Sequence, residues 1–99
     1  MDSKLGEGVP SQEALEAAHT FPGEYTIKII GHNQKDFIAA TRDVCLGVVG
    51  EENILAVNPR NSERGNHLAL TLRLKVQSAE EVQRVYQGLK KVPGVLFLI

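Results

Sequence analysis

The stretch His67–Val76 constrains how this chain can fold more than any other, because its side chains alternate at every second position. Leucine or valine recurs from residue 68 to residue 76, and Ala69, Thr71, Arg73 and Lys75 lie between. A repeat of two residues is typical of a β-strand with one buried face. The stretch is therefore predicted to be a strand that lies between a core and solvent.

Composition limits the chain to one small domain. It has 99 residues, of which 42% are hydrophobic and 23% are charged, and its formal net charge is -1. This balance gives no overall attraction to nucleic acid or to an anionic membrane. The single cysteine, Cys45, excludes an internal disulfide and favours a reducing compartment, the cytoplasm. No apolar run approaches the ~20 residues of a membrane span, and the first residues do not resemble a signal peptide.

The N-terminal part of the chain is expected to lie outside the main domain. Met1–Pro10 is polar and contains glycine, so it is predicted to be a mobile tail. Ser11 is placed to cap a short helix over Gln12–His19. Residues 1–20 are thus predicted to be a flexible tail with a short helix, and residues 21–99 the domain.

The first strand of the domain is predicted over Tyr25–Ile30 and is ended by Gly31. Asn33 is expected to cap the helix that follows, with Asp36 in its first turn. Apolar residues at helical spacing then predict its buried stripe: Phe37, Ala40, Thr41, Val44, Cys45 and Val48. On this stripe Cys45 is a core residue and not a nucleophile.

The second half of the chain predicts two more strands, a helix and a final strand. Ile54–Val57 is a short strand, and the polar loop 58–66 connects it to the leucine-rich strand. Ser78 and Glu81 have the spacing of a capping box at the start of the second helix. Val95–Ile99 is a final, almost wholly apolar strand.

The order strand, helix, strand, strand, helix, strand predicts a ferredoxin-like α+β fold. In this βαββαβ two-layer sandwich, two helices cover one face of a four-stranded antiparallel sheet. The first and third strands lie at the centre, so Val95–Ile99 becomes an apolar edge. Edges of this kind are usually covered. A homodimer through the sheet or through the terminal strand is one way to cover it.

The loop after the first strand is a candidate ligand site, formed by Gly31, His32 and Asn33. Backbone N–H groups at the start of a helix can accept an anion or a carboxylate. The histidines His19, His32 and His67 are scattered, and none has a second ligand at metal spacing. The sequence therefore predicts neither a metal site nor a cofactor, and it contains no recognisable catalytic constellation.

An alternative interpretation is a weak binder of RNA or phosphate. The RNA-recognition fold has the same strand order, but its aromatic positions hold Asn66, Leu68 and Leu70 here. Only an electrostatic contact remains, through the open sheet face and the 60–66 loop. Nucleic acid is thus the less favoured partner. The basic residues of this alternative are Lys28, Arg60, Arg64, Arg73 and Lys75.

Residues 21–99 also resemble a known family. The residues that carry the resemblance are Phe21-Pro22, Tyr25, Lys28, Gly31, Ser62, Gly65, His67, Tyr86, Leu89 and the segment Val92–Ile99. In order and spacing they resemble the YbeD-like family of small uncharacterised bacterial proteins. At position 67 this chain has histidine where tyrosine is expected.

This resemblance implies a fold similar to ACT domains, which bind amino acids or other small ligands and often pair through their sheets. ACT domains contact the ligand with a glycine after the first strand, and Gly31 has the comparable place. No activity is established for the family. The resemblance therefore implies a non-catalytic, regulatory module that binds a small molecule or a protein partner.

Overall fold

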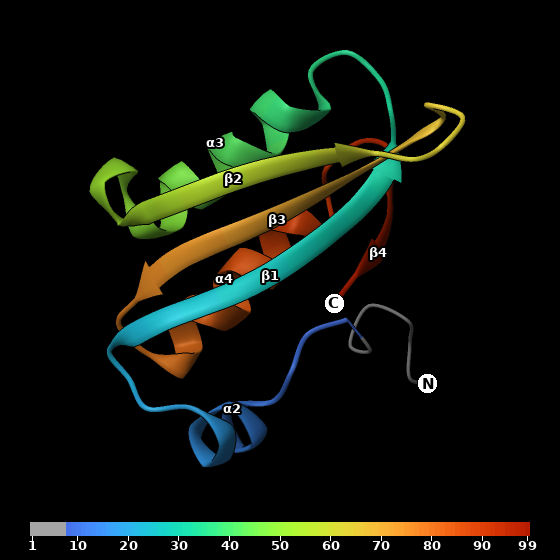
Figure 1. The fold of residues 1–99 in the computed structure, drawn as a ribbon. Helices are drawn as coiled ribbons and strands as arrows, with labels where there is room; N and C mark the ends of the chain where they lie inside the picture. The colour runs from blue at the N-terminus through green and yellow to red at the C-terminus, as the bar shows by residue number, and fades with distance from the viewer. Residues whose placement is uncertain (1–7) are drawn as a thin grey trace.

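The structure, a computed structural model, describes residues 8–99. Its centre is one antiparallel sheet of four strands in the order β2-β3-β1-β4. The strands are β1 (Gly23–His32), β2 (Ile54–Asn61), β3 (His67–Val76) and β4 (Val95–Leu98). The first and third strands are central and the second and fourth are edges, as the sequence predicted (Figure 1).

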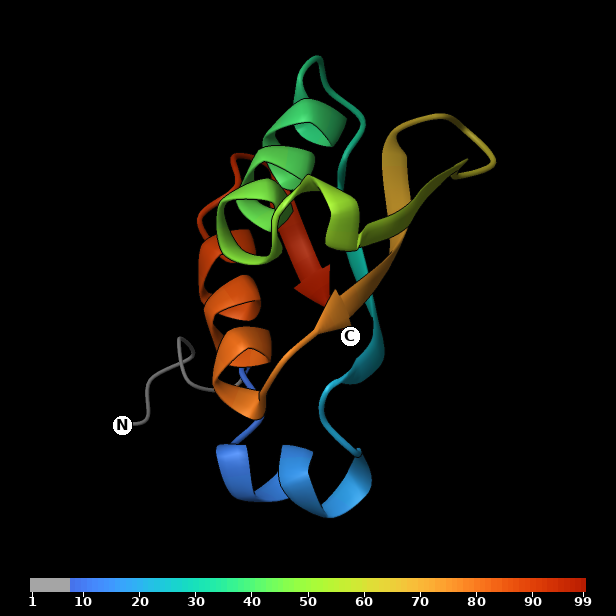
Figure 2. The ribbon, with the colours of Figure 1, turned by 90° about the vertical axis from the view of Figure 1, so that its left-hand side faces the viewer.

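Two helices form the second layer. Figure 2 shows α3 (Phe37–Val49) and α4 (Ala79–Leu89) on the same side of the sheet. A short 3-10 helix, η1 (Glu51–Asn53), connects α3 to β2. The predicted ferredoxin-like βαββαβ sandwich is confirmed, and the other face of the sheet is left open. Within the described residues, no helix combines the length and the apolar character that crossing a membrane requires.

The core lies between the sheet and the two helices. The apolar stripe of β3 points into it, and all five of its members are buried: Leu68, Leu70, Leu72, Leu74 and Val76. Ile27 and Ile29 of β1 and Phe37 of α3 belong to the same apolar cluster. The intervening residues of β1 and β3 therefore face away from the helices.

The helix near the N-terminus is α2 (Gln12–Ala18). Ser11 caps it, and its side-chain oxygen accepts a hydrogen bond of 3.1 Å from the N–H of Ala14. Leu15 is 2% exposed and joins the core cluster. Residues 1–7 of the predicted mobile tail lie outside the described residues. The division of the chain into a tail and a domain at residue 20 stays a prediction.

Helix α4 begins as its capping box predicted. The Ser78 side chain accepts a 3.2 Å hydrogen bond from the N–H of Glu81. The Glu81 carboxylate in turn accepts a 2.8 Å bond from the N–H of Gln77. The Ser78 side chain thus satisfies a backbone donor that a helix start leaves unpaired, and the Glu81 side chain holds the residue before the cap.

Two strands are longer than the sequence indicated. β1 continues through Gly31 to His32, and β2 continues to Asn61. The polar loop therefore shrinks to a turn between Asn61 and His67. This turn is closed by a 2.9 Å bond from the N–H of Ser62 to the carbonyl of His67, and Gly65 adopts φ 76°. Polar residues can extend the hairpin because strand pairing uses backbone N–H and C=O groups. Every residue except proline supplies both groups, whatever its side chain.

The predicted cap of the first helix is wrong. The residue before α3 is Asp36, whose φ is 73° and whose side chain makes no capping bond. Asn33 lies three residues earlier and uses its side chain elsewhere, on the β2–β3 turn. A competing long-range partner for Asn33 thus overrides the local capping preference.

Candidate functional site

One corner of the sheet brings together the two loops that the sequence singled out. The end of β1, the end of β2 and the start of β3 meet there, beside the β2–β3 turn (Figure 1). We call this place the histidine corner and define it by three segments: 32–33, 60–62 and 65–67. The loop after the first strand and the 60–66 loop are thus one site, which their separation in the sequence conceals.

Asn33 holds the corner together. Its side-chain amide donates a 3.0 Å bond to the Asn61 side-chain oxygen and a 2.8 Å bond to the Gly65 carbonyl. Its backbone N–H donates a 2.9 Å bond to the Asn66 carbonyl. Asn33 is exposed, but its amide group is occupied in these bonds. Asn33 therefore holds the β2–β3 turn against the end of β1.

Two histidines face each other at this corner. His32 and His67 are direct partners in the β1–β3 ladder. Their rings lie 5.8 Å apart between centroids, with 28° between the ring planes. Directly opposite residues in an antiparallel pair point to the same face of the sheet. In the sequence these histidines look scattered, but counting the antiparallel register outward from the paired apolar positions Ile29 and Leu70 brings His32 opposite His67.

A small hollow opens on the sheet face next to the pair. Its volume is about 180 Å³. Ile30 and Ala69 are partners in the β1–β3 ladder and form its apolar floor. The other lining residues are Arg60, Asn61, Ser62 and His67. The hollow thus combines an apolar floor with one guanidinium, one imidazole and the polar side chains of Asn61 and Ser62.

Gly31 does not line this hollow. It is buried within β1, and a Cβ added to it would lie 2.5 Å from two ring atoms of Phe37 and 2.7 Å from the Gly94 carbonyl. Glycine at this position lets the Phe37 ring and the chain before β4 approach the strand. His32 and Asn33 lie at the corner itself, whereas Gly31 contacts the core.

The basic residues of the alternative interpretation are exposed, and those of the strands lie on the open face. Lys28, Arg73 and Lys75 occupy outward positions of β1 and β3. Arg73 is ion-paired with Glu24, which holds the pKa of that carboxyl below its usual range. Because Glu24 also faces outward, it offsets part of the positive charge of this face.

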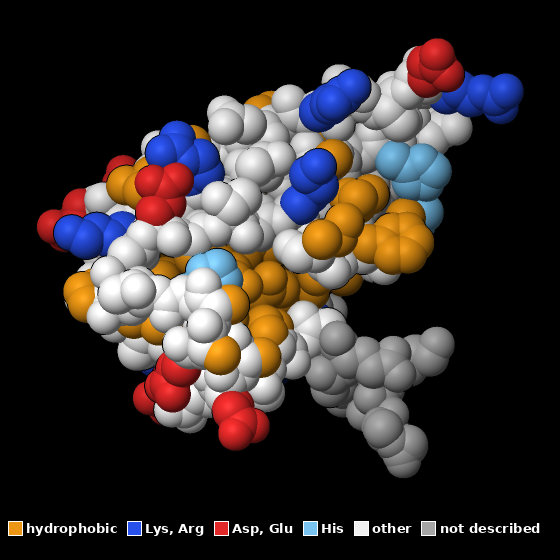
Figure 3. Space-filling view, turned by 60° about the horizontal axis from the view of Figure 1, so that its bottom comes forward, with side chains coloured by type: hydrophobic (Ala, Val, Ile, Leu, Met, Phe, Trp, Pro, Cys, Tyr) orange, Lys and Arg blue, Asp and Glu red, His pale blue; other side chains and the backbone are white. Residues whose placement is uncertain are grey.

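An apolar patch lies on the open face beside the basic residues. Phe97 is the partner of Ile30 across the β1–β4 ladder. Ile99 exchanges two backbone hydrogen bonds with Lys28, of 2.9 and 3.1 Å. Phe97 is 63% exposed and Ile99 is 70% exposed. Figure 3 shows exposed hydrophobic side chains next to histidine and basic side chains on this face.

Cys45 is placed as the sequence predicted. It lies in α3 with none of its surface exposed. Burial raises the pKa of its thiol to about 11. A neutral, buried thiol is a poor nucleophile.

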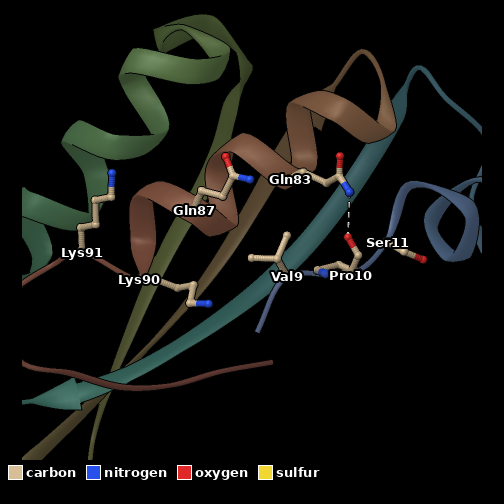
Figure 4. A pocket seen from close by; sticks show the side chains of 7 residues that line it. All are labelled: Val9, Pro10, Ser11, Gln83, Gln87, Lys90 and Lys91. Atoms are coloured by element: carbon tan, nitrogen blue, oxygen red, sulfur yellow. Dashed lines mark hydrogen bonds between the residues drawn. The ribbon is translucent and has the colours of Figure 1, made fainter. Parts of the chain in front are cut away.

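A second hollow, of about 540 Å³, lies between the segment 9–11 and α4 (Figure 4). Gln83 spans it by donating a 3.0 Å bond to the Pro10 carbonyl. Lys90 and Lys91 contribute to its lining. None of the site candidates that the sequence predicts lies there, and residues 1–7, which lie near this segment in the sequence, are outside the described part of the chain. We therefore place the candidate site at the histidine corner.

Comparison with solved structures supports the fold. An uncharacterized protein from Thermotoga maritima superimposes with a TM-score of 0.59 and 17% sequence identity, over 78% of this chain and 94% of that one. The ACT domain from the GTP pyrophosphokinase of Chlorobium tepidum gives a TM-score of 0.58 and 18% identity, over 78% and 95% of the two chains. At these identities the likeness concerns the architecture alone.

Comparison of sequences gives the family. A UPF0250 protein from Janthinobacterium sp. (strain Marseille) is 26% identical, over 96% of this chain and all of its relative. A UPF0250 protein from Bordetella pertussis is also 26% identical, over 92% and 97% of the two chains. The model of the family described as "Protein of unknown function (DUF493)" matches residues 16–99. This chain therefore belongs to the DUF493 family, and its resemblance to YbeD-like proteins is confirmed.

Proposed function

We propose that this protein is a non-catalytic binding module that takes a small carboxylate ligand with a compact apolar group at the histidine corner. The observation that carries the proposal is the hollow of about 180 Å³ with Arg60 in its lining and Ile30 and Ala69 as its floor. Arginine binds carboxylates through paired, charge-assisted hydrogen bonds, and apolar groups gain from leaving water. Amino acids are the simplest ligands with both properties.

The position of the hollow at the histidine corner supports the proposed binding function. His32 and Asn33, two residues of the predicted ligand loop, lie beside the hollow, and Asn33 is fixed by three hydrogen bonds. β1 and β2 end here and β3 begins, so every lining residue except Ser62 lies in a strand and is held by regular backbone pairing.

The proposal is tested by NMR titration with amino acids and short aliphatic carboxylates. We expect amide shifts at Ile30 and Ala69, and a loss of affinity of at least about tenfold on Arg60→Ala, because hydrogen bonds to charged groups contribute about 1.5–3 kcal/mol. Arg64→Ala is the matched control, since Arg64 is an arginine of the adjoining turn that does not line the hollow. Absence of shifts at millimolar ligand, or equal affinities of the Arg60→Ala and wild-type chains, would reject the proposal.

A second candidate function is contact with another copy of the chain. It is favoured by the exposed side chains of Phe97 and Ile99 at the β4 edge, next to the half-buried Ile30 of β1. Burying such side chains would stabilise a dimer, and the outer edge of β4 presents backbone groups that can pair with a second chain. We expect Phe97→Asp to reduce the solution mass, measured by light scattering, from two chains to one. Leu55→Asp, at an exposed leucine of the other edge strand, is expected to leave the mass unchanged. A wild-type chain that stays monomeric at NMR concentrations would exclude this interface.

The weak RNA or phosphate binder remains the less favoured alternative. Its support is the presence of Lys28, Arg73 and Lys75 on the open face, and the pairing of Arg73 with Glu24 weakens it. Binding of this kind would fall steeply with salt and would be abolished by reversing Arg73 and Lys75 to glutamate. A signal that does not change with salt would reject it.

A further inference from the structure

We propose that His32 and His67 form a two-histidine site for a divalent ion of a late first-row transition metal. The inference does not depend on the carboxylate ligand proposed above. It begins from the register of the sheet, in which the two residues are directly opposite each other in β1 and β3. Both side chains are exposed, and their ring centroids are 5.8 Å apart.

The geometry of the pair suits chelation. Metal–nitrogen bonds to histidine are about 2.0–2.1 Å long, so two imidazole nitrogens on one ion lie about 3 Å apart. Rings with centroids at 5.8 Å and planes 28° apart reach this separation by side-chain rotation, without movement of the backbone. Exposure of both side chains leaves room for that rotation and gives an ion direct access from solvent.

The backbone under the pair is held on both sides. The N–H of His32 donates a 2.9 Å bond to the Gly94 carbonyl, next to β4. The N–H of His67 donates a 3.0 Å bond to the Ser62 side chain, next to β2. The bonds of Asn33 to Asn61 and Gly65 tie the same corner together. The backbone that carries the two ligands is thus already positioned, so binding has to order only the two side chains.

The ligand set indicates the class of ion. Among residues 8–99, no three histidine, cysteine or acidic side chains are grouped so that they could hold a metal, so the protein supplies two nitrogen ligands and water completes the coordination. Imidazole favours copper, nickel and zinc, and affinity for such a site rises from Ni²⁺ to Cu²⁺ and falls again to Zn²⁺. Arg60 lines the hollow that His67 also lines, so its positive charge opposes the ion.

The test is calorimetric titration of the full chain, without an affinity tag. CuCl₂ and NiCl₂ are titrated into separate samples. We expect one ion per chain and an increase in the thermal midpoint on binding. His32→Ala and His67→Phe should each weaken binding at least about tenfold, since losing even a second-shell partner costs about 10–100-fold. The electron paramagnetic resonance spectrum of the Cu²⁺ form should show two nitrogen ligands in the wild-type chain and one in either variant.

His19→Ala is the control, because His19 contacts Phe21 and Tyr25 and is the third histidine of the chain. It should bind Cu²⁺ as the wild-type chain does. Circular dichroism checks that each variant keeps its fold, which we expect because both replaced side chains are exposed. Equal Cu²⁺ affinities of the His67→Phe and wild-type chains, or loss of binding in the His19→Ala chain alone, would overturn the proposal.

Discussion

Gly31→Ala is the substitution that most directly tests the packing under the histidine corner. The new Cβ would lie 2.5 Å from the Phe37 ring and 2.7 Å from the Gly94 carbonyl oxygen. Phe37 is 1% exposed, so its ring cannot move away from the new Cβ without displacing core neighbours. The carbonyl is backbone and accepts the bond from His32, so moving it would loosen the link between β1 and β4.

The magnitude follows from two opposing effects. Overpacking a well-filled core costs about 1–3 kcal/mol, and two contacts below 3 Å against constrained neighbours place Gly31→Ala in the upper part of this range. Alanine also reduces the conformational entropy of the unfolded chain, and this effect stabilises the folded protein by about 0.4–1 kcal/mol. The φ of Gly31 is not positive, so no backbone strain adds to the cost. We expect a net loss of about 2 kcal/mol in the free energy of unfolding.

Thermal unfolding followed by circular dichroism measures this loss. For a chain of this size, 1 kcal/mol corresponds to about 4–8 °C, so the midpoint should fall by about 8–16 °C. Gly47→Ala is the matched control, since Gly47 lies in α3 with nothing within 4 Å of its added Cβ, and it should raise stability. In a Phe37→Leu background Gly31→Ala should cost less. A Gly31→Ala chain as stable as the wild type would refute the packing argument.

Three further predictions concern the core and the open face. Gly88→Ala should lower the free energy of unfolding, measured by chemical denaturation, because the new Cβ would lie 2.6 Å from the Val44 side chain. This clash should outweigh the higher helix propensity of alanine. Adding Val44→Ala should restore part of the lost stability. Cys45 should resist thiol reagents at pH 8 until urea unfolds the chain, since its pKa is raised to about 11; fast labelling of the native protein would contradict this. Arg73→Ala should raise the pKa of Glu24, followed by NMR of the carboxyl carbon, and an unchanged pKa would show that the ion pair is absent in solution.

Much of the fold could be predicted because it depends on strong local patterns. The alternation in β3 and the Ser78–Glu81 capping box each indicate one structure only, and both are confirmed. The strand ends were harder to predict. Gly31 has the character of a strand end but lies within β1, and its burial against Phe37 depends on a contact between distant elements. Asn33 likewise has a typical capping residue type but bonds to the β2–β3 turn.

The site was predicted in pieces and not as a whole. His32 and Asn33 were candidates in one loop and Arg60 in another, and only the registers of β1 and of β2 against β3 show that they share a corner. The facing of His32 and His67 depends on β1 continuing past its predicted end at Ile30 to His32, because polar residues at a strand end carry no hydrophobic signal; β3 begins at His67 as predicted. Composition and periodicity therefore predict the scaffold better than the site.

The position of His67 makes the two binding proposals separable. His67 lines the hollow next to Arg60 and also faces His32 across the ladder. Arg60→Ala should therefore remove carboxylate binding and leave Cu²⁺ binding intact or tighter, because a positive charge is lost. His32→Ala should do the reverse, since His32 does not line the hollow. Replacement of His67 alone should affect both ligands. If Arg60→Ala and His32→Ala instead impaired both ligands equally, the corner would act through its shared fold and not through two distinct sets of contacts.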